Sequence, residues 1–335
     1  MTTQPSANQT GPEASLTLRA VRWDDLHVVA QLIYDICEAE GDTSVAVTPD
    51  DLANEWKYEG FNPEQDACLV EARDGRAVGY AALFDVREHC DLSCDVYVHP
   101  EYKGLGVDAT LLRAMEIRAR QHIPLAAPGQ RVFIRVPMDN KDETGKAVFA
   151  REGYVPVRYH WRMGIDLDAA PPAPILPAGF EIRPFVKVEH ATAVWQARNE
   201  SFRENWGSHT LTFAEFSYYC FDNPEYDPTL WTVIWAAKEV AGFSINHYRM
   251  DIGWIHMLGV RPAWRKKGLG LALLHHSFGE FYRRGMKTIG LGVDASNATG
   301  ATRLYQKAGM RTVSQFVTFE KELRAGKTES ERAAS

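Results

Sequence analysis

The residues with the clearest chemical potential are three consecutive cations followed by two glycines, in the stretch RPAWRKKGLGLALL. Residues 265–267 are Arg-Lys-Lys, Gly268 and Gly270 follow, and the chain then becomes apolar. The first backbone N–H groups of a helix have no partner within the helix, and the helix dipole adds partial positive charge at that end. Glycines let an anion approach these groups without a Cβ in the way. The stretch therefore predicts a phosphate site at the start of a helix.

The flanking residues predict the elements that position this turn. The apolar run from Trp254 to Val260 predicts a strand, and Pro262 ends it because proline cannot donate to the hydrogen-bond ladder. After the glycines, Leu274, Phe278 and Phe281 recur at helical spacing. This spacing predicts a helix that buries one apolar stripe.

The same pattern occurs twice in the chain. The stretch VHPEYKGLGVDATLL aligns without a gap with VRPAWRKKGLGLALL, so that Val98 matches Val260 and Gly106 matches Gly268. Each half also begins with a short apolar strand containing arginine, continues with helical stretches and gives two adjacent strand-like runs. This fixed order of elements indicates a duplicated unit and an α/β fold with a mixed sheet.

A segment rich in proline and alanine, DLDAAPPAPILPAGF, separates the two halves. Its composition cannot sustain a helix or a central strand, so we interpret it as a linker. The predicted organisation is a disordered lead at 1–15, domains at 16–166 and 180–324, a linker at 167–179 and a frayed tail at 325–335.

Composition excludes several classes of partner. The chain has 335 residues, of which 45% are hydrophobic and 24% charged, and its net charge is −7. This charge does not attract nucleic acid or an anionic membrane, so any anion site must be local. The sequence has no apolar run of about 18 residues and no signal peptide at its start. We therefore expect no nucleic-acid partner, no membrane association and a monomer or homodimer.

The five cysteines are scattered and odd in number, which favours reduced thiols and a cytoplasmic location. His89, Cys90 and Cys94 lie close together in the sequence, but no further ligand is adjacent to them. A metal site needs more ligands than these. The sequence therefore predicts no metal.

Three fixed positions of the glycine turn carry a resemblance to a known family. Arg265, Gly268 and Gly270 match the Arg/Gln-x-x-Gly-x-Gly/Ala loop of the GNAT family of acyl-CoA N-acyltransferases, and Asn297 and Tyr305 match its later motif. The resemblance covers essentially the whole chain as a tandem, and is strongest to mycothiol-synthase-like two-domain members. It implies two GNAT-like domains, each a mixed, mostly antiparallel twisted sheet flanked by helices, with acetyl-CoA as cosubstrate.

The first half departs from the family pattern at two positions. Asp108 stands where the second half has Gly270, and it adds a negative charge beside the expected phosphates. Phe149 stands where the second half has Tyr305, and phenylalanine has no proton to donate. We therefore expect catalysis in the C-terminal domain and a degenerate N-terminal domain. An alternative alignment, shifted by two residues, would keep two glycines at the first turn.

The resemblance implies direct transfer of an acetyl group to an amine. In this reading Tyr305 protonates the departing thiolate, although a core tyrosine is the alternative, and Asn297 binds the cofactor or caps a helix. Gly259 is either a bulge residue at the strand end or a plain strand glycine. The expected cofactor contacts are Leu258, Gly259, Val260, Arg265, Lys266, Lys267, Gly268, Leu269, Gly270, Leu271 and Asn297.

His256 is the first candidate for general base, because an unperturbed pKa of about 6.5 suits removal of a proton from an ammonium group. Asp251 and Glu200 are its rivals. The aromatic and acidic region that begins near residue 198 predicts an acceptor site for a small-molecule amine, and a solvated acidic face is the alternative. The expected acceptor contacts are Glu200, Trp206, Tyr218 and Asp251.

Trp254 stands where the resemblance to mycothiol synthases implies a glutamate, which argues against the mycothiol precursor as acceptor. Two other functions stay open from the sequence. One is a non-catalytic acyl-CoA sensor, and the other is acetylation of protein N-termini or lysines.

Overall fold

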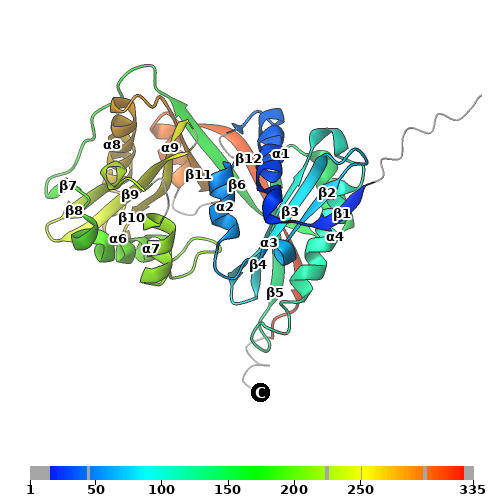
Figure 1. The fold of residues 1–335 in the computed structure, drawn as a ribbon. Helices are drawn as coiled ribbons and strands as arrows, with labels where there is room; N and C mark the ends of the chain where they lie inside the picture. Colours follow the sequence, from blue (N-terminus) through cyan, green and yellow to red (C-terminus); the bar gives the residue numbers. More distant parts are fainter. Residues whose placement is uncertain (1–15, 44–45, 223–225, 250, 297–299, 328–335) are drawn as a thin grey trace, which may run out of the picture. The chain divides into compact units, whose positions relative to one another are not determined.

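The computed structural model describes residues 16–43, 46–222, 226–249, 251–296 and 300–327. The chain folds into two compact units (Figure 1). Unit 1 comprises residues 1–157 and 317–335, and unit 2 comprises residues 158–316. None of the helices in the described residues has both the length and the apolar character needed to cross a bilayer.

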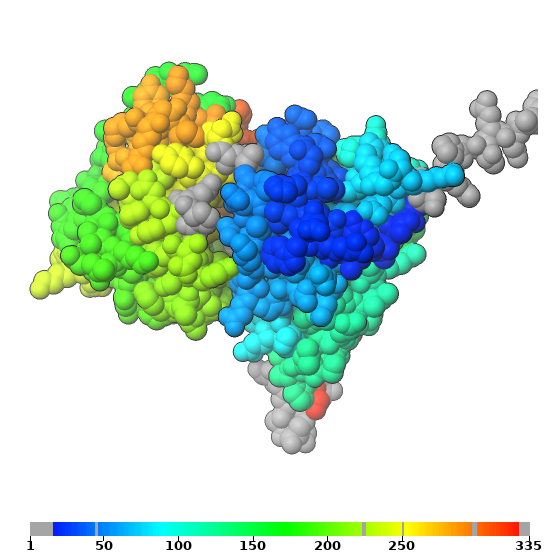
Figure 2. All heavy atoms as spheres, viewed as in Figure 1, coloured from blue at the N-terminus to red at the C-terminus, as the bar shows by residue number. Residues whose placement is uncertain are grey.

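Unit 1 is a mixed sheet with helices on both faces. Its strand order is β1-β2-β3-β4-β5-β12, and β4 pairs with β5 in parallel while β1 to β4 are antiparallel. Figure 2 shows the segment from β1 to α1, in blue, on the surface of this unit. Its elements are β1 (Thr17–Ala20), η1 (Trp23–Asp25), α1 (Leu26–Ala39), α2 (Pro49–Trp56), α3 (Pro63–Asp66), β2 (Ala67–Glu71), β3 (Ala77–Arg87), β4 (Asp91–Val98), η3 (Pro100–Tyr102), α4 (Val107–Arg120), β5 (Val132–Asp139), α5 (Glu143–Arg151) and the first residues of β6 (Val155–Asp166).

Unit 2 repeats this arrangement. Its strand order is β6-β11-β10-β9-β8-β7, in which β10 and β11 are parallel and the other neighbours are antiparallel. Its remaining elements are β7 (Phe180–Pro184), α6 (Lys187–Phe202), α7 (Phe213–Phe221), η4 (Pro228–Leu230), β8 (Thr232–Ala236), β9 (Glu239–Arg249), β10 (Ile252–Val260), η5 (Pro262–Trp264), α8 (Leu269–Arg283), β11 (Thr288–Asp294), α9 (Ala301–Lys307) and the first residues of β12 (Arg311–Arg324), whose later residues belong to unit 1.

The alternation of side chains along each strand builds a separate core on each face of the sheet. In β8, Val233 and Trp235 pack with α6 and α7, whereas Ile234 packs with α8. The predicted apolar stripe of α8 is confirmed, since Leu274, Phe278 and Phe281 are all buried. Successive strand residues point to opposite faces, so one strand supplies both cores.

The compact units divide the chain differently from the predicted domains 16–166 and 180–324. Residues 160–166 of β6 pair with β11 in unit 2, and the end of β12 lies beside β5 in unit 1. Glu320 of β12 accepts hydrogen bonds from Arg131 and Arg135, and Phe319 packs on Phe149. The last strand of each sequence half therefore completes the sheet of the other unit. Residues 167–179 contain no helix or strand, whereas the lead at 1–15 and most of the tail lie outside the described residues.

Candidate active site

Strands β10 and β11 separate within unit 2 and open a cavity between them. Their parallel pairing runs from Gly253–Ile289 to Ile255–Leu291 and then stops, although the strands continue to Val260 and Asp294. On its other side β10 stays paired with β9 as far as Val260. The cavity measures about 580 Å³, and its lining includes residues 255–260 of β10, 264–266 and 268–271 at the helix turn, 291–294 of β11, and Tyr305.

The irregular position in β10 is His256. The register with β9 shifts between Ile255 and Met257, so His256 is the extra residue of a bulge. Gly259 instead keeps its regular partner, Phe243. A Cβ at Gly259 would lie 2.7 Å from the Phe243 ring, so this glycine is required by close packing. Of the two interpretations of Gly259, the strand glycine holds and the bulge does not.

The glycine turn forms the start of α8 as predicted. Gly268 is the N-cap, with φ +83°, and no neighbouring atom lies within 4 Å of where its Cβ would be. Lys266 also adopts a left-handed backbone, with φ +64°. The first turn of this 15-residue helix contains no acidic residue and no side-chain cap. Its N–H groups are therefore available to an anion, and the residues present fit a diphosphate.

The three cationic side chains before the glycines differ in their contacts. Arg265 donates to the carbonyl oxygens of Val260 and Ser201, and pairs with Glu204 at 3.3 Å. It thus fastens the turn to the end of α6. Lys266 lines the cavity, whereas the ammonium of Lys267 lies 6.0 Å from the Phe180 ring and is not part of the lining.

Gly270 serves the packing of α8 against α9. A Cβ at Gly270 would lie 2.8 Å from Cδ2 of Leu304, while Leu304 itself lines the cavity. The fixed glycine in the sequence pattern therefore allows α9 to approach the start of α8. Leu258, Val260, Leu269 and Leu271 also lie in the lining.

Tyr305 of α9 is 7% exposed and contributes to the cavity wall. Burial raises the pKa of its phenol to about 12. The group is therefore protonated at neutral pH, and within the described part of the chain its hydroxyl has no hydrogen-bond partner. A protonated phenol facing a cavity can donate to a ligand there.

His256 is exposed to the cavity but lies deep among protein atoms. Desolvation, with added repulsion from Arg249 and Arg198, lowers its pKa to about 4. The neighbouring His247, whose ring centroid lies 5.2 Å away, has its pKa lowered to about 3. The expectation of an imidazole that titrates near pH 6.5 is therefore wrong, because both rings stay neutral well below that pH.

These two histidines predict an acid-sensitive stability. Between pH 6.5 and about 4 the unfolded chain binds protons at both rings and the folded chain does not, so stability falls as the pH falls. The double variant His247→Asn, His256→Asn should lose less stability than the wild type between pH 7 and pH 5. Urea unfolding at both pH values measures this, with His27→Asn, an exposed histidine of α1, as control. An unchanged pH dependence in the double variant would contradict the prediction.

The four expected acceptor contacts do not line the cavity. Glu200 forms a bidentate ion pair with Arg261, and Asp251 is exposed in the β9–β10 turn. Trp206 lies beside His160, with ring centroids 6.2 Å apart, and Tyr218 lies beside Tyr219 on the exposed side of α7. Neither rival of His256 for the role of base therefore reaches the cavity.

Two carboxylates do line the cavity, Glu204 at the end of α6 and Asp294 at the end of β11. Asp294 pairs with Arg158 of β6 at 2.5 Å. Glu204 lies in the acidic stretch after residue 198 but was not among the four expected contacts, and nothing near Asp294 in the sequence marked that residue. Its position depends on where β11 separates from β10. Asn297 lies outside the described residues.

The matching turn of unit 1 already carries an anion of its own. Asp108, in the first turn of α4, is 5% exposed and accepts a hydrogen bond from the Ala109 N–H. Lys103, the counterpart of Arg265, pairs with Glu40 and Asp142, both at 2.9 Å. Phe149, the counterpart of Tyr305, is buried against Phe319.

Comparison with known proteins identifies the class. The model of the acetyltransferase (GNAT) family matches residues 31–143 and 191–310, more than half of the chain. The chain therefore belongs to the GNAT family, and it is an acyltransferase with two GNAT domains in tandem.

Individual relatives support this. Mycothiol acetyltransferase from Salinispora arenicola (strain CNS-205) is 28% identical over 328 residues, which cover 94% of this chain and 99% of that protein. The GCN5-related N-acetyltransferase from Sphaerobacter thermophilus has a TM-score of 0.82 at 33% identity, with 94% of this chain and 98% of that one covered. A tandem GNAT protein from the clavulanic acid biosynthesis pathway shares the fold, with a TM-score of 0.67, 17% identity and 93% and 100% coverage.

Proposed function

We propose that this acetyltransferase transfers the acetyl group of acetyl-CoA to a primary amine of a small molecule, in unit 2. The observation that carries the proposal is a single cavity lined both by the uncapped start of α8 and by the protonated phenol of Tyr305. The first feature suits a diphosphate and the second suits a leaving thiolate.

In the proposed reaction the amine nitrogen attacks the thioester carbonyl, a C–N bond forms and the C–S bond breaks. Tyr305 gives its proton to the departing thiolate, and the proton lost by the amine returns to the phenolate through solvent. The backbone N–H groups of β10 beyond Ile255, where β11 no longer pairs, supply donors for the developing oxyanion. The products are an N-acetyl amine and CoA with a free thiol.

His256 has a narrower role than the sequence indicated. With a pKa of about 4, its imidazole is neutral and can accept a hydrogen bond from the attacking amine. At pH 7 this imidazole is too weak a base to remove a proton from an ammonium group. The amine must therefore reach the site already deprotonated or lose its proton to water. We therefore assign His256 to orienting the amine.

The acceptor site is proposed at the carboxylates that line the cavity. Glu204 and Asp294 would attract a cationic or polyhydroxylated amine. Because relatives of this chain are named mycothiol acetyltransferases, the amine that those enzymes acetylate is one of the acceptors to be tested.

The test is release of CoA thiol from acetyl-CoA with a panel of amines, measured for the full chain. The panel contains amino sugars, polyamines, the amine acetylated by mycothiol acetyltransferases, and peptides with free N-termini or lysines. Turnover of a small amine, with none of the peptides, is expected. Turnover of peptides alone would contradict the proposed acceptor class, and tight CoA binding without turnover of any amine would contradict the proposed reaction.

A further inference from the structure

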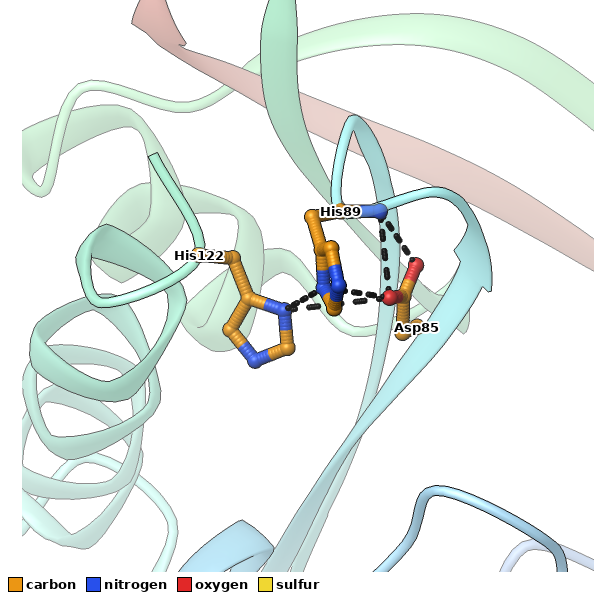
Figure 3. A group of neighbouring side chains, drawn as sticks. All are labelled: Asp85, His89 and His122. Carbon is orange, nitrogen blue, oxygen red and sulfur yellow. Dashed lines mark hydrogen bonds and ion pairs between the residues drawn. The ribbon is translucent and has the colours of Figure 1, made fainter. Parts of the chain in front are cut away.

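Unit 1 contains a cluster of side chains that the transfer reaction does not use (Figure 3). Asp85 lies near the end of β3, His89 in the turn between β3 and β4, and His122 just after α4. In the described part of the chain, this is the group of histidines, cysteines and carboxylates whose ligand atoms converge enough to hold a metal ion, all within 4.8 Å of one another.

The three ligand atoms form a compact triangle. His89 Nδ1 lies 2.6 Å from Asp85 Oδ2 and 3.0 Å from His122 Nδ1, and the third side, from His122 Nδ1 to Asp85 Oδ2, is 3.9 Å. Tetrahedral zinc with ligand distances of about 2.0–2.1 Å separates its ligand atoms by roughly 3.3 Å. The observed separations bracket this value, so small side-chain shifts would place all three atoms around one ion.

The hydrogen-bond arrangement of the cluster leaves lone pairs directed at one point. The carboxylate of Asp85 can only accept, so the proton of the shortest contact resides on His89 Nδ1. His122 Nδ1 then directs its lone pair toward this proton of His89 and acts as a second acceptor. Replacing that single proton by a cation would satisfy all three atoms. The other nitrogen of His122, Nε2, is buried without a hydrogen-bond partner among the described residues.

The cluster is anchored on its inner side and open on its outer side. His122 is only 7% exposed, whereas the side chains of His89 and Asp85 are 39% and 23% exposed. The backbone N–H of His89 also donates to both carboxylate oxygens of Asp85, at 2.9 and 3.0 Å. An ion could therefore enter from solvent and keep a water molecule as a fourth ligand.

The donor set selects the ion. Two imidazole nitrogens and one carboxylate oxygen suit zinc and neighbouring first-row metals, whereas magnesium and calcium prefer oxygen ligands throughout. The cysteines that the sequence placed beside His89 do not join the site. Cys90 Sγ accepts a hydrogen bond from Gln130 at 2.9 Å, and Cys94 is buried in the core.

We propose that unit 1 binds one Zn²⁺ ion through Asp85 Oδ2, His89 Nδ1 and His122 Nδ1. The zinc site is independent of the proposed acceptor, because the cluster belongs to unit 1 and the transfer cavity belongs to unit 2. The ion ties the β3–β4 turn to the end of α4. Its role is structural. Residue spacing in the sequence gave no sign of this cluster, because His122 is 33 residues away from His89.

The test uses the full chain without a histidine tag, treated with EDTA, dialysed and titrated with ZnCl₂ by calorimetry. We expect about one Zn²⁺ per chain and a higher temperature of unfolding with zinc. His89→Ala should weaken binding at least tenfold, because even outer-shell changes at metal sites cost about 10–100-fold in affinity. Co²⁺ should give visible absorption in the wild type that His89→Ala loses.

His27→Ala, which removes an exposed histidine of α1, is the matched control and should bind zinc like the wild type. Asp85→Asn provides a second variant if His89→Ala does not fold, as judged by circular dichroism. Excess Mg²⁺ should not displace zinc. The proposal is overturned if the wild type binds no Zn²⁺, or if folded His89→Ala or Asp85→Asn binds it as tightly as the wild type does.

Discussion

Replacing Tyr305 by phenylalanine should lower kcat about 100- to 10,000-fold and leave the affinity for CoA nearly unchanged. This range is typical of losing a general acid. Phenylalanine fills the same buried space at α9, so packing is retained and only the hydroxyl is lost. Because the pKa of Tyr305 is about 12, the wild type should also show no loss of activity from this group between pH 7 and pH 10.

Steady-state kinetics and calorimetric titration with CoA check this prediction. Phe149→Tyr, the reverse change at the matching position of unit 1, is the control and should neither raise kcat nor rescue Tyr305→Phe. If Tyr305→Phe turns over at the wild-type rate, the hydroxyl is not the proton donor. A parallel loss of CoA affinity would indicate that the side chain supports binding instead.

Introducing an aspartate at Gly270 should weaken CoA binding about 100-fold. The change gives α8 the residue that α4 carries as Asp108. At an effective dielectric constant of about 20, two unit charges about 5 Å apart repel by roughly 3 kcal/mol, which corresponds to about two decades of affinity. The new side chain also meets Cδ2 of Leu304, the flexible end of its side chain.

Gly270→Asn separates these two effects, since it adds the same bulk without the charge. We expect Gly270→Asn to lose clearly less affinity than Gly270→Asp, and the difference should shrink as salt is added. Asp108→Asn in unit 1 should leave CoA binding unchanged. Equal losses for Gly270→Asp and Gly270→Asn would assign the effect to packing, and a changed affinity in Asp108→Asn would move the binding site to unit 1.

The elements around the glycine turn follow from local sequence. The apolar run at 254–260 is strand β10, the stripe of Leu274, Phe278 and Phe281 is buried in α8, and Gly268 is the left-handed N-cap. Each depends on residues within a few positions of one another, through side-chain periodicity and backbone sterics. The duplication and the family were also readable, because a fixed spacing survives in both halves.

The acceptor contacts could not be predicted from local sequence. Composition favoured Glu200, which proves to be paired with Arg261, and it gave no reason to select Asp294, which lines the cavity. Whether a carboxylate lines the cavity depends on contacts with distant segments, as the pairing of Asp294 with Arg158, 136 positions away, also shows. The expected pKa of His256 was wrong because it ignored the folded environment. Burial around the bulge lowers the pKa, and repulsion from Arg249 and Arg198 lowers it further.

By itself, the sequence determined the class of this protein: a tandem acetyltransferase with the family's glycine turn in its second half and an acidic, altered turn in its first. The tertiary structure alone decided which last strand completes which sheet, where β10 and β11 separate, and that Asp85, His89 and His122 meet. The reason is physical: backbone propensity and side-chain periodicity act over a few residues, whereas strand exchange, cavity shape and ligand convergence depend on contacts between segments far apart in the chain.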